Sequence, residues 1–308
     1  MLGPVLLAAA RSDSIRRIVS AAPVTRPVVN RFVAGERLDA SMAAVRSLTA
    51  RGLDVTLDHL GEDITDRAEA RRNRDAYLAL TEALSAEGLG DRAEMSVKLS
   101  AFGQALPGGH DLAYENVLPV VEAAAEAGTT VTLDMEDHTT VDSTLAVLAQ
   151  LRTRFPQTGA VVQSYLFRTE DDCRALAGAG SRVRLVKGAY KEPADVAFQD
   201  KRDVDRAYVR CLKILMAGKG YPMIGSHDPR MVAITQELAG RYGRKQDEYE
   251  FQMLYGIREA EQRRLVADGH RMRVYVPYGT DWYGYFMRRL AERPANLAFF
   301  LRSLATRG

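Results

Sequence analysis

Residues 95–136 read MSVKLSAFGQALPGGHDLAYENVLPVVEAAAEAGTTVTLDME and contain the pattern that decides the fold. A short segment that alternates apolar and polar residues, Met95 to Ala101, is followed by an amphipathic stretch, Leu112 to Ala127, and by a second short segment, Thr130 to Glu136. Alternation with a period of two predicts a strand, and apolar residues three and four apart predict a helix. The order strand, helix, strand predicts a parallel pair with a right-handed crossover.

The same unit recurs along the chain. The predicted strands are Asp54 to Leu60, Met95 to Ala101, Thr130 to Glu136, Ala160 to Leu166, Val183 to Ala189, Pro222 to His227, Tyr249 to Tyr255 and Met272 to Tyr278. The predicted helices are Arg67 to Glu87, Leu112 to Ala127, Asp142 to Arg154, Asp171 to Ala179, Arg202 to Ala217, Met231 to Tyr242, Glu259 to Val266 and Asp281 to Glu292.

Eight strands that alternate with eight helices predict an α/β fold, a closed (β/α)8 TIM barrel. An open, doubly wound sheet is the alternative. Apolar residues at helical spacing before the first strand predict an N-terminal helical arm, which we assign to residues 1–45. Residues 46–308 are then the catalytic barrel, and we expect the last helix to pack over the active site.

Composition limits the class of protein. With 46% hydrophobic and 27% charged residues, the 308-residue chain is expected to be globular. Its 42 basic and 40 acidic residues nearly cancel, and no long run of like charges predicts binding to nucleic acid or a polybasic membrane contact. The two cysteines, Cys173 and Cys211, give no disulfide framework, so we expect a cytoplasmic protein. The apolar run at residues 3–10 is too short to span a bilayer and is interpreted as a helix start.

Polar residues on the predicted strands indicate where the chemistry lies, because alternate residues of a barrel strand point inward and active sites form at the carboxyl ends of the strands. Lys98 shares a face with Ser96 and Ser100, and Asp134 has the equivalent place on the next strand. We therefore expect Asp134 to be the nearest partner of Lys98. The predicted interior polar set is Lys98, Asp134, Gln163, Arg184 and Tyr275.

Basic residues outnumber acidic ones in this set once Arg288 and Arg289 of the last helix are added. Buried charges need partners, so the apparent surplus favours an anionic ligand such as a carboxylate substrate or an anionic reduced cofactor. Tyr285 is three and four residues from these arginines and shares their helix face. A pair of arginines is well suited to hold a carboxylate, although the same face could be exposed and closed by an ion pair between Arg288 and Glu292.

Single motifs suggest other chemistries. The segment Gly88 to Ala93 has the dinucleotide-binding pattern GxGxxA, but it follows a helix and precedes a strand, which is the reverse of the required order. Asp134, Glu136 and His227 could bind a metal in a barrel lyase or isomerase, but no pair of them has strong ligand spacing, and we expect no metal. A lysine at a strand end could form a Schiff base.

Seven segments, in order, resemble the FAD-dependent proline dehydrogenase family in its monofunctional bacterial form. They are Ser96–Ser100, Leu133–Glu136, Val161–Tyr165, Arg184–Tyr190, Ser226–Asp228, Val274–Pro277 and Tyr285–Glu292. The resemblance implies oxidation of L-proline to Δ1-pyrroline-5-carboxylate, with a hydride passing from the ring carbon beside nitrogen to N5 of FAD. It also implies a quinone as electron acceptor, reached by peripheral contact with the inner face of the cell membrane. The chain ends soon after the barrel, so a separate pyrroline-5-carboxylate dehydrogenase is expected to take the product.

The resemblance also implies roles for individual residues. Asp134 and Arg184 would be catalytic: Asp134 would orient Tyr275, and Arg184 would lie near flavin N5. The implied substrate-binding residues are Lys98, Tyr190, Tyr275, Tyr285, Arg288 and Arg289. The implied cofactor contacts are Met135, Gln163, Arg184, Val186, Lys187, Gly188, Ala189, Tyr190, Ser226, His227 and Glu292.

Overall fold

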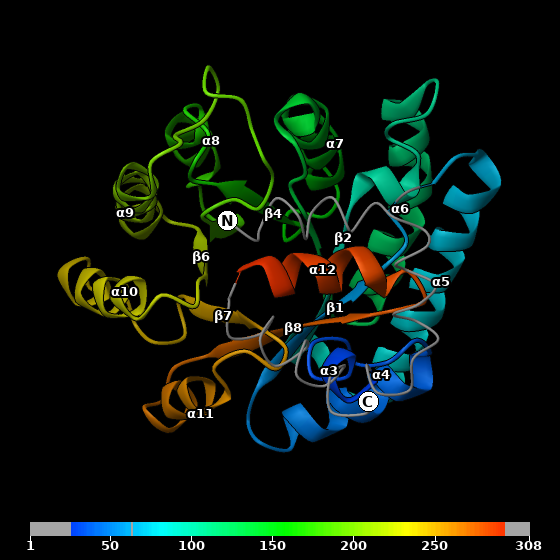
Figure 1. Ribbon diagram of the computed structural model, residues 1–308, viewed down its shortest axis with the longest axis horizontal. Coiled ribbons are helices and arrows are strands. Elements are labelled where there is room, and N and C mark those ends of the chain that lie inside the picture. Colours follow the sequence, from blue (N-terminus) through cyan, green and yellow to red (C-terminus); the bar gives the residue numbers. More distant parts are fainter. Residues whose placement is uncertain (1–25, 63, 293–308) are drawn as a thin grey trace, which may run out of the picture.

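Eight parallel strands close into one barrel in the computed structural model, which describes residues 26–62 and 64–292 (Figure 1). The strands are β1 (Asp54–His59), β2 (Ala93–Val97), β3 (Thr130–Leu133), β4 (Gly159–Gln163), β5 (Arg182–Val186), β6 (Tyr221–Gly225), β7 (Glu250–Leu254) and β8 (Met272–Tyr278). Each strand pairs with the next, and β8 closes the barrel on β1 with Asp54 opposite Arg273. The predicted barrel is confirmed, and the open doubly wound sheet is wrong.

Helices lie around the outside of the barrel and across one end of it (Figure 1). They are α3 (Arg26–Val29), α4 (Leu38–Thr49), α5 (Arg67–Ala86), α6 (Gly109–Glu126), α7 (Val141–Arg152), α8 (Thr169–Leu176), α9 (Lys201–Ala217), α10 (Pro229–Arg241), α11 (Glu259–Ala267) and α12 (Trp282–Glu292). The side chains of Asp66, Asp200 and Asp228 accept hydrogen bonds from main-chain N–H groups at the starts of α5, α9 and α10, which fixes where these helices begin. Within the described ranges, no helix combines the length and apolar character that crossing a bilayer requires.

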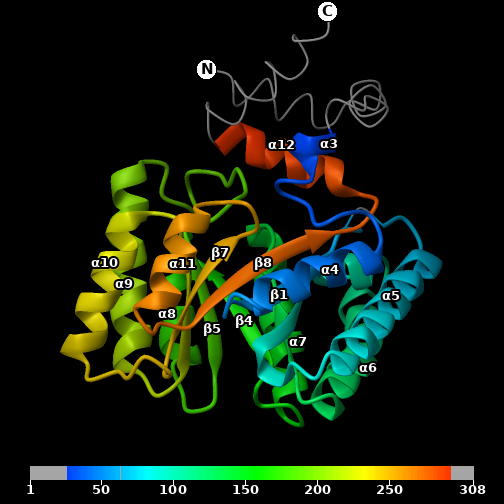
Figure 2. The same ribbon diagram turned by 90° about the horizontal axis from the view of Figure 1, so that it is seen from below.

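The predicted arm is described only in part, because residues 1–25 lie outside the described residues. Its remainder contains α3 and most of α4, and α4 continues beyond residue 45 to Thr49. Val28 and Phe32 pack with Trp282 and Phe286 of α12 in an apolar cluster separate from the main core. Figure 2 shows α3 and α12 side by side across the end of the barrel toward which β8 points.

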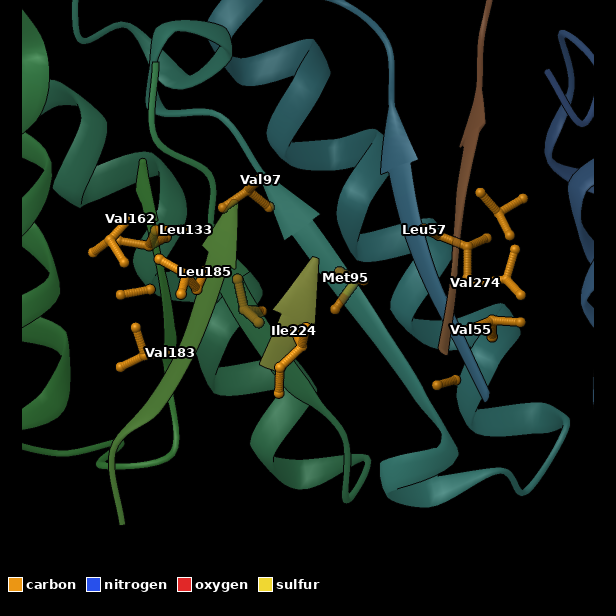
Figure 3. Close-up of a cluster of buried hydrophobic side chains, with 14 of the residues drawn as sticks. Val55, Leu57, Met95, Val97, Leu133, Val162, Val183, Leu185, Ile224 and Val274 are labelled. Atoms are coloured by element: carbon orange, nitrogen blue, oxygen red, sulfur yellow. The ribbon is translucent and has the colours of Figure 1, made fainter. Parts of the chain in front are cut away.

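The main apolar core lies between the strands and the helices. Figure 3 shows strand side chains from this layer, labelled at Val55, Leu57, Met95, Val97, Leu133, Val162, Val183, Leu185, Ile224 and Val274. The strand residues between these apolar ones point into the barrel, and many of them are polar or charged. Glu94, Arg273 and Glu250 are all fully buried there. The barrel interior is therefore a layer of ion pairs inside an apolar shell.

Strands β2 and β3 end earlier than predicted. β2 stops at Val97, and the chain then forms a short 3-10 helix, Leu99–Phe102, that ends at Gly103 with a φ of +105°. β3 stops at Leu133. Lys98 and Asp134 are thus the first residues beyond their strands, which puts both at the carboxyl-end mouth of the barrel.

Candidate active site

Lys98 lies among three carboxylates at the mouth of the barrel. Its Nζ is 2.8 Å from Asp58 Oδ2, 3.0 Å from Glu62 Oε1 and 3.8 Å from Asp134 Oδ2. The expectation that Asp134 is its nearest partner is wrong, because Asp58 on β1 points inward and lies closer. Burial alone would lower the pKa of Lys98, but the carboxylates of Asp58 and Glu62 outweigh burial and raise it well above its usual value. The ammonium group therefore stays charged.

Arg184, on β5, is 4% exposed and is held by four acceptors. Its Nη1 donates to Asp134 Oδ1 (2.7 Å) and to Ser96 Oγ (2.9 Å). Its Nη2 donates to Glu94 Oε1 (3.0 Å), and its Nε donates to Gln252 Oε1. These acceptors come from β2, β7 and the residue after β3, so the guanidinium is fixed from several sides of the barrel.

Asp134 joins two groups of the predicted interior set. One carboxylate oxygen accepts from Arg184, and the other accepts from the hydroxyl of Tyr275 at 2.6 Å. The guanidinium carbon of Arg184 lies 5.3 Å from the centre of the Tyr275 ring. Burial, and next the charge of Asp134, raise the pKa of Tyr275 well above its usual value. The phenol therefore stays protonated and acts as a hydrogen-bond donor.

The predicted surplus of positive charge is wrong for the barrel interior. Asp58, Glu62 and Glu94 face the basic residues, and none of the three belongs to the predicted interior set. Asp58 alternates with Thr56 on the first predicted strand, so the period-two rule could have found it. Glu94 lies one residue before the predicted start of the second strand. Because this boundary was predicted too late, Glu94 was not assigned to the barrel interior.

Helix α12 reaches the same cluster through Glu62. Glu62 Oε1 is 3.0 Å from Lys98 Nζ, and its Oε2 is 3.7 Å from Arg288 Nη2. Burial would raise the pKa of Glu62, but Lys98 and then Arg288 lower it below its usual value. Arg289 stacks over the ring of Tyr285 at 5.1 Å. The alternative ion pair from Arg288 to Glu292 is not described, since the side chain of Glu292 lies outside the described part of the chain.

The segment after β5 is shaped by contact with the ring of Tyr165. Gly188 has a φ of +124°, and a Cβ at this position would lie 2.4 Å from Tyr165 Cδ1. Both facts require glycine. The main-chain N–H of Tyr190 donates to the hydroxyl of Tyr165 at 3.3 Å, and that of Ala189 donates to Gln163 Oε1 at 3.4 Å. Gln163, Gly188, Ala189 and Tyr190 are therefore brought together at one side of the mouth.

The other proposed cofactor residues of this region are also placed. Met135 and Val186 belong to the apolar cluster around Tyr165. The side chain of Lys187 turns toward the outer helices, where its Nζ pairs with Asp205 and, at 2.9 Å, with Asp228. Only main-chain groups of Lys187 are left to face the mouth.

The residues after β6 are held by local hydrogen bonds. Ser226, 8% exposed, accepts at Oγ from the N–H of Asp228 at 3.2 Å. Asp228 in turn caps α10, and hydrogen bonds from Arg230, then Lys187, lower its pKa. The carbonyl oxygen of His227 accepts from Arg258 Nη1 at 2.7 Å.

The three residues proposed as metal ligands in the alternative hypothesis make hydrogen bonds to other groups. His227 Nε2 accepts from the main-chain N–H of Leu254 at 2.9 Å. Asp134 is bound as described above, and Glu136 accepts from the hydroxyl and N–H of Ser100 at 2.6 and 3.1 Å. In residues 26–62 and 64–292, no three His, Cys, Asp or Glu side chains are grouped as metal ligands. The lyase or isomerase alternative thus has no supporting geometry.

Comparison with known proteins identifies relatives over most of the chain. The family model described as proline dehydrogenase matches residues 41–302. The chain is 39% identical over 280 residues to proline dehydrogenase 1 of Bacillus subtilis, covering 91% of each protein, and 41% identical to a proline dehydrogenase of Deinococcus radiodurans, covering 90% of each.

Solved structures show the same fold. A crystal structure of proline utilization A from Bdellovibrio bacteriovorus, inactivated by N-propargylglycine, superposes with a TM-score of 0.81 at 25% identity. The match covers 96% of this chain but 35% of that longer one, so the comparison concerns about a third of that protein. With the family model and the two bacterial relatives, it establishes that this chain belongs to the proline dehydrogenase family.

Proposed function

We propose that this protein oxidises L-proline to Δ1-pyrroline-5-carboxylate with bound FAD as the hydride acceptor. The observation that carries the proposal is the position of Glu62. Its carboxylate lies between the cations of Lys98 and Arg288, at 3.0 and 3.7 Å. This place in the molecule already accommodates a carboxylate, which is the group that an amino-acid substrate would present.

The proposed substrate contacts surround this place. Lys98 and Arg288 would attract the proline carboxylate, and Arg289 would complete the positive end of the pocket. The rings of Tyr190, Tyr275 and Tyr285 would line the apolar part of proline and exclude water. Tyr285 is 6% exposed and packs in the apolar cluster of α12.

Asp134 has a positioning and electrostatic role in the proposal. Its two oxygens bind Arg184 and Tyr275 at 2.7 and 2.6 Å, so it sets the distance between the guanidinium and the phenol. The amine of proline must lose a proton before its ring carbon can give up a hydride.

The mouth of the barrel also has features that fit a flavin. Val186, Ala189 and Gly225 have small side chains or none. Val186 and Gly225 are half-buried and Ala189 is exposed, so these residues border this part of the mouth. The φ angle of Gly225 lies outside the left-handed region, so the backbone conformation alone does not require glycine there. A Cβ there would lie 2.7 Å from Val186 Cγ1 and would crowd the space beside Arg184. Buried arginine next to small side chains suits a planar ring that gains negative charge.

FAD, when bound, supplies the hydride acceptor at N5. The residues that would hold it are Met135, Gln163, Arg184, Val186, Lys187, Gly188, Ala189, Tyr190, Ser226, His227 and Glu292. Lys187 would take part through its main chain, because its side chain pairs with Asp205 of α9 and with Asp228, which caps α10.

The later fate of the electrons and product forms part of the proposal. A membrane quinone would accept the electrons during peripheral contact from the cytoplasmic side, and a separate pyrroline-5-carboxylate dehydrogenase would take the product. Support for these partners comes from the family resemblance.

The visible spectrum before and after anaerobic L-proline tests the proposal. We expect purified protein to carry a flavin absorption that L-proline bleaches and that prolinamide, which lacks the carboxylate, leaves largely unchanged. Protein that binds no flavin, or a flavin that L-proline does not reduce, would refute the proposed function. Equal reduction by prolinamide would refute the carboxylate contact alone.

A further inference from the structure

Gln252, on β7, has only one chemically allowed orientation. Its Nε2 lies 2.6 Å from Glu250 Oε1, which also accepts from Arg273 Nε at 2.8 Å. Burial would raise the pKa of Glu250, but Arg273 and then Arg182 lower it, so this side chain is an ionised acceptor. The amide nitrogen of Gln252 must therefore face Glu250. Its oxygen is left to face Arg184 Nε, where it accepts a hydrogen bond.

This arrangement connects the floor of the barrel to the mouth. Arg273 and Glu250 are fully buried and Gln252 is 4% exposed, so bulk water cannot substitute for a lost hydrogen bond. The hydrogen bonds run from Arg273 on β8 through Glu250 and Gln252 on β7 to Arg184 on β5.

The acceptors of Arg184 differ in what they constrain. Glu94 and Asp134 hold the two terminal nitrogens, and both carboxylates also accept hydrogen bonds from other groups: Glu94 from Thr56 and Arg182, and Asp134 from Tyr275. Gln252 holds Nε, the nitrogen nearest the side-chain stem, and it presents a single oxygen in a fixed direction. Contact at Nε adds a third point to the contacts of the two terminal nitrogens, and three points define the plane of the guanidinium.

We propose that Gln252 is a positioning residue for the reaction: it fixes the guanidinium plane of Arg184 and thereby the positions of Asp134 and Tyr275. The inference rests on the proposed function, in which Arg184 lies beside the flavin. Gln252 itself would touch neither substrate nor cofactor.

Substitution of Gln252 separates positioning from packing. In Gln252→Leu, the Arg184 guanidinium loses its Nε acceptor, and we expect kcat to fall about tenfold or more while the proline KM changes less than about threefold. The anaerobic equilibrium between flavin and proline should shift about tenfold toward oxidised flavin, equivalent to about 30 mV for two electrons.

Asn116→Leu is the matched control. Asn116 is 4% exposed and donates to the carbonyl oxygens of Phe102 and Leu112, away from Arg184. It should lower the melting temperature as Gln252→Leu does, but leave kcat and the flavin equilibrium unchanged. If Gln252→Leu behaves like this control, Gln252 is structural and the inference is wrong. If Gln252→Leu does not fold, Gln252→Asn, whose shorter amide cannot reach Arg184, carries the same expectations.

Arg184→Lys separates a failure of the positioning role of Gln252 from a failure of the proposed function. If this variant lowers kcat and shifts the flavin equilibrium while Gln252→Leu does neither, the positioning inference alone has failed. If Arg184→Lys changes neither quantity, the proposed place of Arg184 beside the flavin has failed, and the inference fails with it.

Discussion

Replacing Lys98 with methionine should destabilise the fold strongly and in a way that depends on pH. Methionine has nearly the same length, so the main change is the loss of a cation 2.8 Å from Asp58 and 3.0 Å from Glu62. The side chains of Lys98 and Asp58 are 11% and 2% exposed, and removal of one partner from a buried ion pair costs about 3–5 kcal/mol. At about 2 °C per kcal/mol for a chain of this size, the melting temperature should fall by about 6–10 °C near pH 8.

The direction of the pH effect follows from Glu62. With Lys98 present, the pKa of Glu62 in the folded protein is below its usual value of 4.5, so this carboxylate contributes stability that is lost only as the pH falls through that lowered pKa. Without Lys98, burial raises the folded pKa, and stability is lost as the pH rises above 4.5. The pKa of Asp58 is already raised by burial even beside Lys98. The stability difference between variant and unchanged protein should therefore be larger at pH 8 than at pH 5.

Thermal unfolding followed by circular dichroism at these two pH values tests this expectation. Lys213→Met, at an exposed position on α9, is the control and should change the melting temperature by less than about 1 °C. Adding Asp58→Asn to Lys98→Met removes one unpaired carboxylate and should recover a substantial part of the loss. A loss below about 1 kcal/mol, or one that is equal at both pH values, would refute the reasoning.

Three further substitutions test the α12 and β5 regions. Arg288→Met should raise the proline KM by about two orders of magnitude in steady-state assays, because half of the carboxylate contact is removed; a change below about threefold would contradict its assignment. Gly188→Ala should lower stability by about 1–3 kcal/mol and reduce flavin retention, because the added Cβ would lie 2.4 Å from the ring of Tyr165. Melting temperature and bound-flavin absorbance measure the two effects, and unchanged values would argue against a tight contact. Trp282→Phe should lower the free energy of unfolding by about 1 kcal/mol in denaturant unfolding, because the indole Nε1 of Trp282 donates to Glu36 Oε1 at 3.0 Å. A second substitution, Glu36→Gln, should add little to this loss, because both changes remove the same hydrogen bond.

The sequence was sufficient to predict the barrel because hydrophobic periodicity is a local signal that repeats. Each strand and helix of the predicted alternation is present, with ends displaced by a few residues. The ends are less predictable because they depend on local turn geometry. The early stop of β2, for example, depends on the 3-10 turn that ends at Gly103.

Pairing among charged side chains could be predicted less well. Period-two alternation correctly gave Lys98, Asp134 and Arg184 inward positions, but it carries no information on distances across the barrel. Lys98 pairs with Asp58 because β1 lies directly beside β2, and the shorter β3 puts Asp134 at 3.8 Å from Lys98 Nζ. Tyr165 was assigned only to a shared strand face, and its contact with Gly188 depends on how the segment after β5 folds back.

The distribution of the interior ion pairs has a consequence for protein synthesis. Glu94 of β2 and Arg184 of β5 leave the ribosome well before Glu250 and Arg273, which belong to the last two strands. A nascent chain that lacks β7 and β8 has the buried charges of a barrel without all of their partners, so its interior remains hydrated. Folding during synthesis should therefore pause at an open, hydrated barrel of six strands until residue 273 emerges, and truncated or split versions of the chain should depend on chaperones to stay soluble.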